Sequence, residues 1–165
     1  IETVEDLIRV ITEELSKRLY DVVIQSMAVL DYVPKITLKK KMPSGKSEWV
    51  IKLVETPKVI RMIRKLHPGV FLVGFKLEVG KDRNELVERA YQALKRYDAD
   101  LFVANDLSQI EIGKHIGYMV NGCGEVVGEG TTKEEISKRL IDIVEKGIGR
   151  EERRRSGCST RRQSC

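Results

Sequence analysis

The sequence DLFVANDLS, residues 100–108, is a short apolar run that stops abruptly in polar residues. Four consecutive apolar residues are typical of a strand that is buried on both faces, and Asn105 and Asp106 directly after them indicate that the chain leaves the sheet there. In open α/β sheets, ligands bind just beyond the carboxyl ends of such strands. We therefore expect Asn105 and Asp106 to lie at the ligand-binding edge of a largely parallel sheet.

The same pattern occurs twice more along the chain. The apolar run at 20–25 is followed within a few residues by Asp31, and the run at 70–75 leads directly into Lys76 and then Glu78. The carboxyl ends of parallel strands meet at one edge of a sheet. Three strand ends are therefore expected to present polar side chains at that edge.

Amphipathic segments separate these strands. Apolar residues recur with helical spacing in two of them, of which the first is capped by Thr3. Two more are indicated by residues that suit a helix start, Thr56–Pro57 and Thr132, and Gly147 suits a helix stop. The expected helices are 3–19, 56–66, 82–97 and 133–146. Strands and helices that alternate in this way predict an α/β fold, a three-layer Rossmann-like or ribokinase-like domain whose mostly parallel sheet has helices on both faces.

Two other regions predict antiparallel strand pairs. Residues 35–41 and 49–54 flank a turn that contains Pro and Gly, and they are expected to form a two-stranded arm with a mobile tip. Residues 116–120 and 126–127 flank a Gly-rich turn, which predicts a hairpin at one edge of the sheet.

Length and composition are those of a single compact domain. The chain has 165 residues, of which 41% are hydrophobic and 33% charged, and a chain of this length can bury a sizeable core. No apolar run approaches the roughly 18 residues that a membrane span requires, so no membrane partner is expected. Three cysteines without the spacing of zinc ligands, and a start without the features of a signal peptide, favour a cytoplasmic protein.

The positive charge is concentrated at the C-terminal end. The formal net charge is +5, and residues 150–165 contain six arginines and two glutamates, which leaves residues 1–149 with a net charge of +1. This body therefore has no charge excess that would favour nucleic acid as a partner, although binding through the tail is a separate hypothesis. Residues 150–165 lack apolar periodicity and predict a disordered basic tail.

Five short motifs occur in an order and at a spacing that resemble those of a known enzyme family. They are Ser26–Tyr32, the lysine cluster at 35–46, Leu53–Ile60, Val73–Glu78 and Ala104–Ser108. Over about residues 1–146 the sequence resembles the second half of phosphopantothenate-cysteine ligase, an enzyme of coenzyme A biosynthesis that is often fused behind a flavin-dependent decarboxylase. The family's glycine-rich loop and first strand precede everything present here. Residues 1–149 are therefore expected to be part of that domain.

The resemblance implies a two-step ligation. In this family, the carboxylate of 4'-phosphopantothenate attacks the α-phosphate of CTP, or of ATP in eukaryotic members, and pyrophosphate leaves. The amine of cysteine then displaces the nucleotide from the acyl phosphate. The implied cofactors are the nucleotide and Mg²⁺. Residues 76–79 depart from the family's usual sequence, so the choice between CTP and ATP stays open.

The resemblance assigns roles to five positions in the body. Ala28 and Asp31 fall in the loop that holds the nucleotide, and Phe75 falls in a motif at the phosphate and base site. Asn105 and Asp106 fall in the family's Ala-Asn-Asp motif. Asn105 is expected to be catalytic and the other four to bind the nucleotide, while no residue is assigned to a metal.

The family's catalytic lysine maps best to Lys40, with Lys39 and Lys41 as alternatives. A lysine on a movable arm would neutralise the charge that builds up at the α-phosphate and on the leaving pyrophosphate. The arm at 35–54 also leaves open strand edges and family members are dimers, so we expect a homodimer that forms through this arm. A simpler interpretation also stands, in which the basic run is a solvated edge that discourages strand pairing.

Plainer interpretations of the other positions remain open as well. Asn105 and Asp106 can be turn or capping residues. Asp31 can bond its own loop, Phe75 can belong to the core, and Glu78 is a candidate for helping to hold Mg²⁺. The absent glycine-rich loop supports a second hypothesis for the whole domain, a non-catalytic nucleotide-binding or dimerisation module that completes the active site of another chain.

Overall fold

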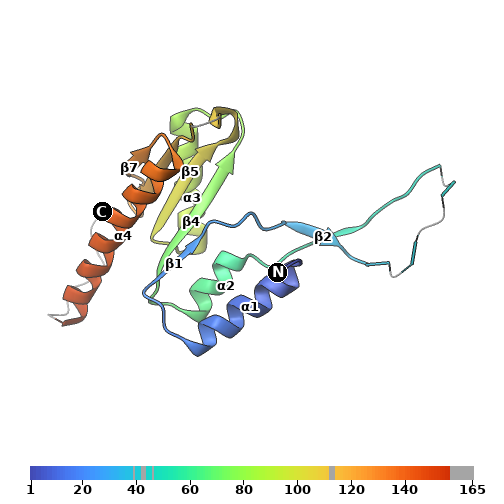
Figure 1. Cartoon of the computed structure of the whole chain (residues 1–165), viewed down its shortest axis with the longest axis horizontal. Helices are drawn as coiled ribbons and strands as arrows, with labels where there is room; N and C mark the ends of the chain where they lie inside the picture. Colours follow the sequence, from blue (N-terminus) through green and yellow to red (C-terminus); the bar gives the residue numbers. More distant parts are fainter. Residues whose placement is uncertain (39, 42–43, 46, 112–113, 157–165) are drawn as a thin grey trace.

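The computed structural model describes residues 1–38, 40–41, 44–45, 47–111 and 114–156 (Figure 1). The elements in chain order are α1 (Val4–Lys17), β1 (Val22–Gln25), β2 (Tyr32–Pro34), β3 (Leu53–Glu55), α2 (Val59–Leu66), β4 (Phe71–Glu78), α3 (Arg83–Tyr97), β5 (Leu101–Asp106), the 3₁₀ turn η1 (Leu107–Gln109), β6 (Gly117–Asn121), β7 (Val126–Gly130) and α4 (Lys133–Ser156). Among these helices, none is both long and apolar enough to cross a membrane.

A mixed five-stranded sheet forms the centre of the molecule, in the order β1-β4-β5-β6-β7. β1, β4 and β5 pair in parallel, and β6 is antiparallel to both β5 and β7, so β6 alone runs in the opposite direction within this sheet. The central strand is β5, and all six of its residues are buried. The predicted α/β fold and the antiparallel edge hairpin are confirmed.

Helices cover both faces of the sheet. α1, α2 and α3 pack on one face, against a cluster that includes Phe102 and Ala104, and α4 packs on the other, against Leu101 and Val103. Successive side chains of a strand point to opposite faces, so β5 contributes alternately to the two cores. This alternation continues into the site residues at the end of β5.

The start of α2 differs from the prediction. Thr56 was expected to cap this helix, but the N-cap is Lys58, which makes no side-chain capping bond. Thr56 is buried and instead donates its hydroxyl hydrogen bond to the carbonyl of Leu30 and its backbone N–H, at 2.9 Å, to the carbonyl of Asp31. Thr56 therefore joins the segment before α2 to the loop after β1.

The arm forms with shorter strands than expected. β2 lies at 32–34, within residues expected to be a loop, and pairs with β3 at 53–55. Among the described residues of the arm, the pairing extends one step further, where the N–H of Lys35 donates to the carbonyl of Lys52 at 2.9 Å. In this part of the chain, strand pairing thus occurs at the base of the arm, where Thr56 anchors it, and the described residues beyond the base project away from the body (Figure 1).

The ends of β5 and α4 also differ from the expectations. Asn105 and Asp106 do not follow the strand but belong to it, because they continue its pairing with β4. α4 does not end near Lys146 but continues to Ser156. Gly147 is needed for packing, since a Cβ there would lie 2.6 Å from the ring of Phe71. Of the tail expected to be disordered, 150–156 belong to α4 and 157–165 lie outside the described residues.

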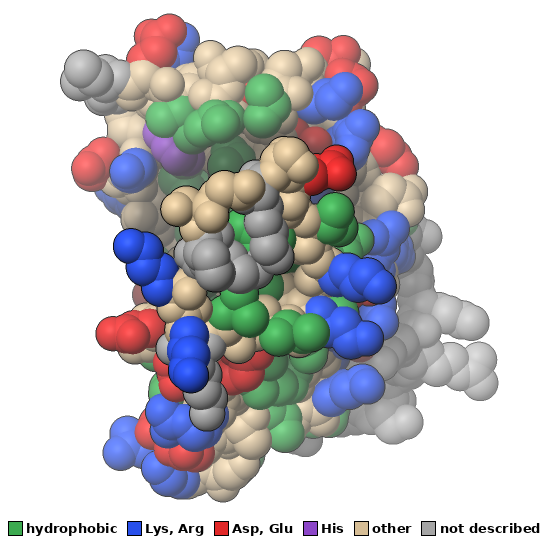
Figure 2. Space-filling model, turned by 90° about the vertical axis from the view of Figure 1, so that its right-hand side faces the viewer, with side chains coloured by type: hydrophobic (Ala, Val, Ile, Leu, Met, Phe, Trp, Pro, Cys, Tyr) green, Lys and Arg blue, Asp and Glu red, His purple; other side chains and the backbone are tan. Residues whose placement is uncertain are grey.

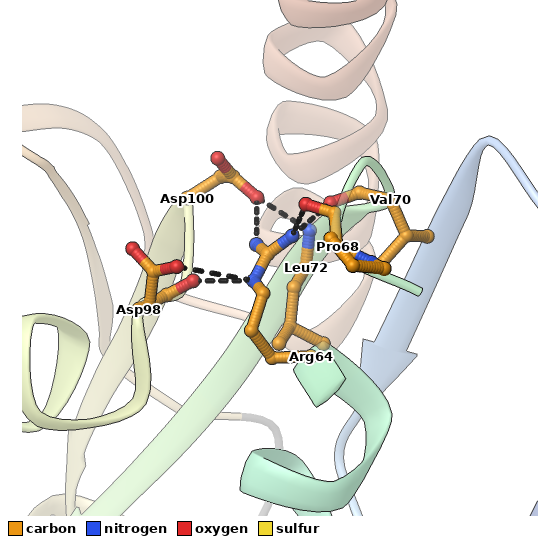
Figure 3. Close-up of polar contacts among 6 residues, drawn as sticks. All are labelled: Arg64, Pro68, Val70, Leu72, Asp98 and Asp100. Carbon is orange, nitrogen blue, oxygen red and sulfur yellow. Dashed lines mark hydrogen bonds and ion pairs between the residues drawn. The ribbon is translucent and has the colours of Figure 1, made fainter. Parts of the chain in front are cut away.

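Arg64 of α2 connects three elements at the amino-terminal edge of the sheet (Figure 3). Its guanidinium donates to the carboxylate of Asp100 at 2.6 Å and to the carbonyls of Asp98, Pro68 and Val70 at 2.6 to 2.9 Å. The same Asp100 oxygen accepts the N–H of Leu72 at 2.8 Å. The Arg64 side chain is only 13% exposed, so a lost partner would leave buried polar groups unpaired.

We expect Arg64→Met to destabilise the protein by about 2 kcal/mol, because the Asp100 carboxylate loses its cation and three carbonyls lose their donor. Urea unfolding followed by circular dichroism measures this change. Lys65→Met, on the exposed side of the same helix, is the matched control and should change stability by less than about 0.5 kcal/mol. Equal midpoints for the two variants would contradict the role assigned to Arg64.

Candidate functional site

The carboxyl edge of the three parallel strands is stepped. β1 ends at Gln25, which pairs with Gly74 of β4, whereas β4 and β5 continue to the pair Glu78 and Asp106. β1 therefore leaves the sheet four residues before β4 does. Residues 26–31 run from this lower part of the edge to the base of the arm (Figure 1).

The loop after β1 carries two of the predicted nucleotide-binding residues. Ala28 is exposed and lines a groove between residues 27–30 and the first turn of α1. The side chain of Asp31 is 67% exposed, and its Oδ1 accepts a hydrogen bond from the ammonium of Lys58 at 2.5 Å. This hydrogen bond raises the pKa of Lys58, and burial opposes it only in part. The loop thus contributes to one groove and to one charged pair.

Asn105 lies on the face of the sheet that α4 covers. It is 4% exposed, and its Nδ2 donates to the carbonyl of Ile116 at 2.7 Å. The opposite residue on β6 is Gly117, where a Cβ would lie 2.9 Å from that same Nδ2. Glycine at this position therefore makes room for the amide, which holds the start of β6 against the end of β5.

Asp106 lies on the opposite face and binds neighbouring parts of the chain. Its Oδ1 accepts the N–H of Gly80 at 3.1 Å and the N–H of Ser108 at 2.7 Å, and it also accepts the Ser108 hydroxyl. Its Oδ2 accepts the N–H of Lys81. These bonds, that of the Ser108 hydroxyl first, lower the pKa of Asp106 from 3.8 to about 2. Because a carboxylate offers about four acceptor sites, little capacity is left for a ligand.

Phe75 packs into the protein. It is half-buried and lies against the apolar cluster between the sheet and α4. Its neighbour Gly74 pairs with the last residue of β1, so Phe75 stands at the level where β1 leaves the sheet. Its contact with a nucleotide stays a prediction.

Lys40 is separated from the other predicted residues. Its side chain is exposed, and it belongs to the segment between β2 and β3. The described part of this segment projects away from the sheet (Figure 1). Lys41 is exposed on the same segment, and Lys39 lies outside the described residues. The body thus brings the strand ends together at one edge, and the arm must move, or meet another copy, for its lysines to reach a ligand there.

Three polar residues near this edge had no signal in the sequence. Lys58 pairs with Asp31 across 27 positions, and no local pattern indicates such a contact. Nδ1 of His115 and Oε1 of Gln109 are buried without a hydrogen-bond partner among the described residues. Burial, and then the charge of Lys133, lower the pKa of His115, so its imidazole is neutral near pH 7.

The candidate Mg²⁺ ligand Glu78 is already paired. Its Oε1 lies 3.1 Å from the ammonium of Lys76 and 3.6 Å from the guanidinium of Arg89. Within the described part of the chain, no group of three or more His, Cys, Asp or Glu side chains could hold a metal ion.

We expect the stability contributed by Asp106 to disappear in acid. Its folded pKa lies below the unfolded value, so the ionised carboxylate stabilises the fold above about pH 4 and loses this effect as the pH falls towards about 2. Asp106→Asn should lower the urea unfolding midpoint at pH 7, and the gap to wild type should narrow between pH 5 and 2.5. The exposed Asp21→Asn is the control. A gap that stays constant over this range would refute the assignment.

The sequence of this chain is similar to those of several known proteins. Residues 1–148 match the family described as DNA/pantothenate metabolism flavoprotein C-terminal domain. The chain is 38% identical over 146 residues to the coenzyme A biosynthesis bifunctional protein CoaBC of Thermococcus kodakarensis, covering 88% of this chain and 36% of that protein. It is 32% identical over 116 residues to phosphopantothenate–cysteine ligase 2 of Oryza sativa, covering 68% of this chain and 34% of that protein.

A solved structure has the same fold. It is the DNA/pantothenate metabolism flavoprotein of Streptococcus pneumoniae, which is 32% identical, with a TM-score of 0.77 over 89% of this chain and 71% of that one. The chain spans about a third of the length of the curated relatives named above. The family resemblance expected from the motifs is confirmed, and the chain belongs to the DNA/pantothenate metabolism flavoprotein C-terminal domain family.

Proposed function

We propose that the protein containing this chain joins 4'-phosphopantothenate to cysteine in coenzyme A biosynthesis. The observation that carries the proposal is that the loop with Asp31 follows β1 and the Asn105-Asp106 motif ends β5, so that both motifs come from the carboxyl ends of parallel strands on either side of β4. Ligands bind at this edge in α/β folds. Relatives named for coenzyme A biosynthesis and for this ligase support the same reaction.

The first step is proposed to form an acyl nucleotidyl intermediate. A carboxylate oxygen of 4'-phosphopantothenate bonds to the α-phosphorus of the nucleotide, and the bond from that phosphorus to the pyrophosphate oxygen breaks. Negative charge builds up on both sides of the phosphorus, and a lysine ammonium offsets it most strongly where water is excluded. Lys40 takes this role when the arm covers the site, with Lys39 and Lys41 as alternatives.

The second step is proposed to form the amide. The amine nitrogen of cysteine bonds to the acyl carbon, the bond to the nucleotide's phosphate oxygen breaks, and the amine releases a proton. Asn105 is the candidate to orient the acyl group, because an amide both donates and accepts. Its Nδ2 is bonded to Ile116, so its carbonyl oxygen is the atom assigned to the substrate.

The co-substrate is proposed to be CTP, or ATP, bound with Mg²⁺. Ala28 lines the groove that would take it, Asp31 would accept from a base amino group or a ribose hydroxyl, and Phe75 would line its surroundings. Asp106 would act by holding residues 80 and 81 in place, given its hydrogen bonds to their backbone. Magnesium, which usually binds substrate phosphates together with few protein ligands, is expected to arrive with the triphosphate and to balance the charge of the leaving pyrophosphate.

The ligase domain is proposed to work together with a decarboxylase in the cytoplasm. Relatives named as bifunctional CoaBC proteins support a decarboxylase that is fused to the ligase or associated with it. The composition of the sequence favours the cytoplasm as the place of the reaction.

The arm is proposed to form a homodimer contact. Among the described residues at 35–52, five large apolar residues are more than half exposed, namely Ile36, Leu38, Trp49, Val50 and Ile51. They border a groove between residues 34–38 and 49–52. Viewed from the side towards which the arm projects, hydrophobic side chains occupy the centre of this face, with Lys and Arg on both sides (Figure 2). Exposed apolar groups of this size favour association with a second copy.

We expect the complete enzyme to form phosphopantothenoylcysteine and pyrophosphate from 4'-phosphopantothenate, cysteine and CTP or ATP with Mg²⁺. Lys40→Gln should lower kcat by about 100-fold or more, because the transition state loses its cation, while the circular dichroism spectrum stays unchanged. Parallel assays of Lys39→Gln and Lys41→Gln identify the lysine that acts, and Lys52→Gln at the base of the arm is the control. Undiminished turnover by all three tip variants would remove the arm from the mechanism.

We also expect the wild-type protein to sediment as a dimer and Trp49→Asp to dissociate at a protein concentration about 100-fold higher, because a charge replaces a buried aromatic contact. Analytical ultracentrifugation over a dilution series measures both. Leu19→Asp, at a residue that is 93% exposed outside the arm, is the matched control. A wild-type monomer at micromolar concentration would exclude the arm-mediated dimer.

A further inference from the structure

We propose that Lys58 is a positioning residue that sets the affinity for the nucleotide by holding the carboxylate of Asp31 and offsetting the negative charge beside it. The inference rests on the proposed function, in which the loop at 26–31 receives the nucleotide. Lys58 lies in the Leu53–Ile60 motif, but the family resemblance assigns it no role. Its basis is a set of contacts at the base of the arm.

Lys58 stands between two exposed carboxylates. Its ammonium is 2.5 Å from Oδ1 of Asp31 and 4.0 Å from Oε1 of Glu55. Both acidic side chains are 67% exposed, whereas that of Lys58 is 31% exposed. The lysine is therefore less exposed to solvent than the two carboxylates. It bonds Oδ1 of Asp31, so the Oδ2 atom stays available for a ligand.

The contact acts on the side chain of Asp31 and not on the fold of its loop. The loop backbone is already held by Thr56, which bonds the carbonyls of Leu30 and Asp31. β2 and β3 pair directly beyond this point. Removing the ammonium of Lys58 would leave these backbone bonds in place, and it would free the carboxylate to rotate.

A helix start is an unfavourable place for a cation. Lys58 is the N-cap of the eight-residue α2 and makes no capping bond there, and positive charge is disfavoured by the helix dipole at this end. The pKa of Lys58 is nevertheless raised, because the hydrogen bond to Asp31 outweighs burial. The ammonium is therefore held by Asp31 and not by the helix.

The net charge of Lys58, Asp31 and Glu55 affects how strongly the neighbouring loop binds a nucleotide, because a nucleotide is a polyanion. Without Lys58, Asp31 and Glu55 would place two uncompensated negative charges beside a triphosphate. Exposed charges repel strongly at low ionic strength and weakly at physiological ionic strength, since the Debye length falls from about 30 Å at 0.01 M to about 8 Å at 0.15 M. A positioning role for Lys58 therefore predicts a salt-dependent effect on nucleotide affinity, which a purely structural role does not.

The test compares Lys58→Met, Lys58→Arg and the control Lys65→Met in the complete enzyme. We expect Lys58→Met to raise the KM for the nucleotide about tenfold at low ionic strength, since a charge-assisted hydrogen bond is lost. Its kcat and its KM for cysteine should stay within about twofold, and the nucleotide effect should shrink as salt is added. Lys58→Arg should restore most of the affinity because it keeps the charge. In an Asp31→Asn background, Lys58→Met should have little further effect.

Two results would overturn the inference while the ligase function stands. One is a wild-type enzyme that ligates and a Lys58→Met variant whose nucleotide KM is unchanged. The other is an equal rise in Lys65→Met, which would show a general loss of charge. A wild-type enzyme that forms no amide product would overturn the proposed function and this inference with it. Should Lys58→Met not fold, as judged by its urea midpoint, Lys58→Gln takes its place under the same criteria.

Discussion

The partly buried ion pair between Arg64 and Asp100 is the contact on which the arrangement of the sheet depends. The guanidinium, which extends from α2, donates hydrogen bonds to residues just before β4 and β5, and the carboxylate that it binds also accepts the N–H of Leu72. This second bond fixes the register of β4 against β5. Because side chains alternate between faces, a shift of one residue would move every side chain of the strand to the opposite face. The amino-terminal contact therefore decides on which face Asn105 and Asp106 lie.

The opposite end of β5 shows why two neighbouring polar residues have different uses. Asp106, on the face of α1 to α3, accepts hydrogen bonds from the backbone of residues 80 and 81 and from Ser108. Asn105, on the face of α4, uses its amide nitrogen to hold the start of β6. Both are buried, and a buried polar group without a partner is costly. These hydrogen bonds therefore hold the carboxyl end of β5 in place. The exposed candidates for ligand binding come instead from the loop after β1 and from the arm.

The parts of the fold that could be predicted are those whose signal is local. The apolar run of β5 and the capping boxes at Thr3 and Asp82 lie within a few residues of the elements that they define. The errors are non-local. Thr56 is a residue type that often caps helices, but its hydroxyl instead donates a hydrogen bond to the carbonyl of Leu30, 26 positions away. Gly147 looks like a helix stop, yet it serves the contact with Phe71. The candidate site followed the same rule, since its motifs were visible in the sequence and the partner of Asp31 was not.

The loop after β1 and the arm behave as one unit. Asp31 is the last residue before β2, its carbonyl is bonded to the residue after β3, and its carboxylate is bonded to the helix that follows. A movement of the arm's base would therefore move the carboxylate proposed to meet the nucleotide. The distal arm exposes its apolar residues, so closure or association would gain apolar burial, at about 25 cal/mol per Å², and this gain would offset the entropy of ordering the segment. The geometry of the base thus links the position of the lysine proposed to be catalytic to the occupancy of the loop proposed to bind the nucleotide.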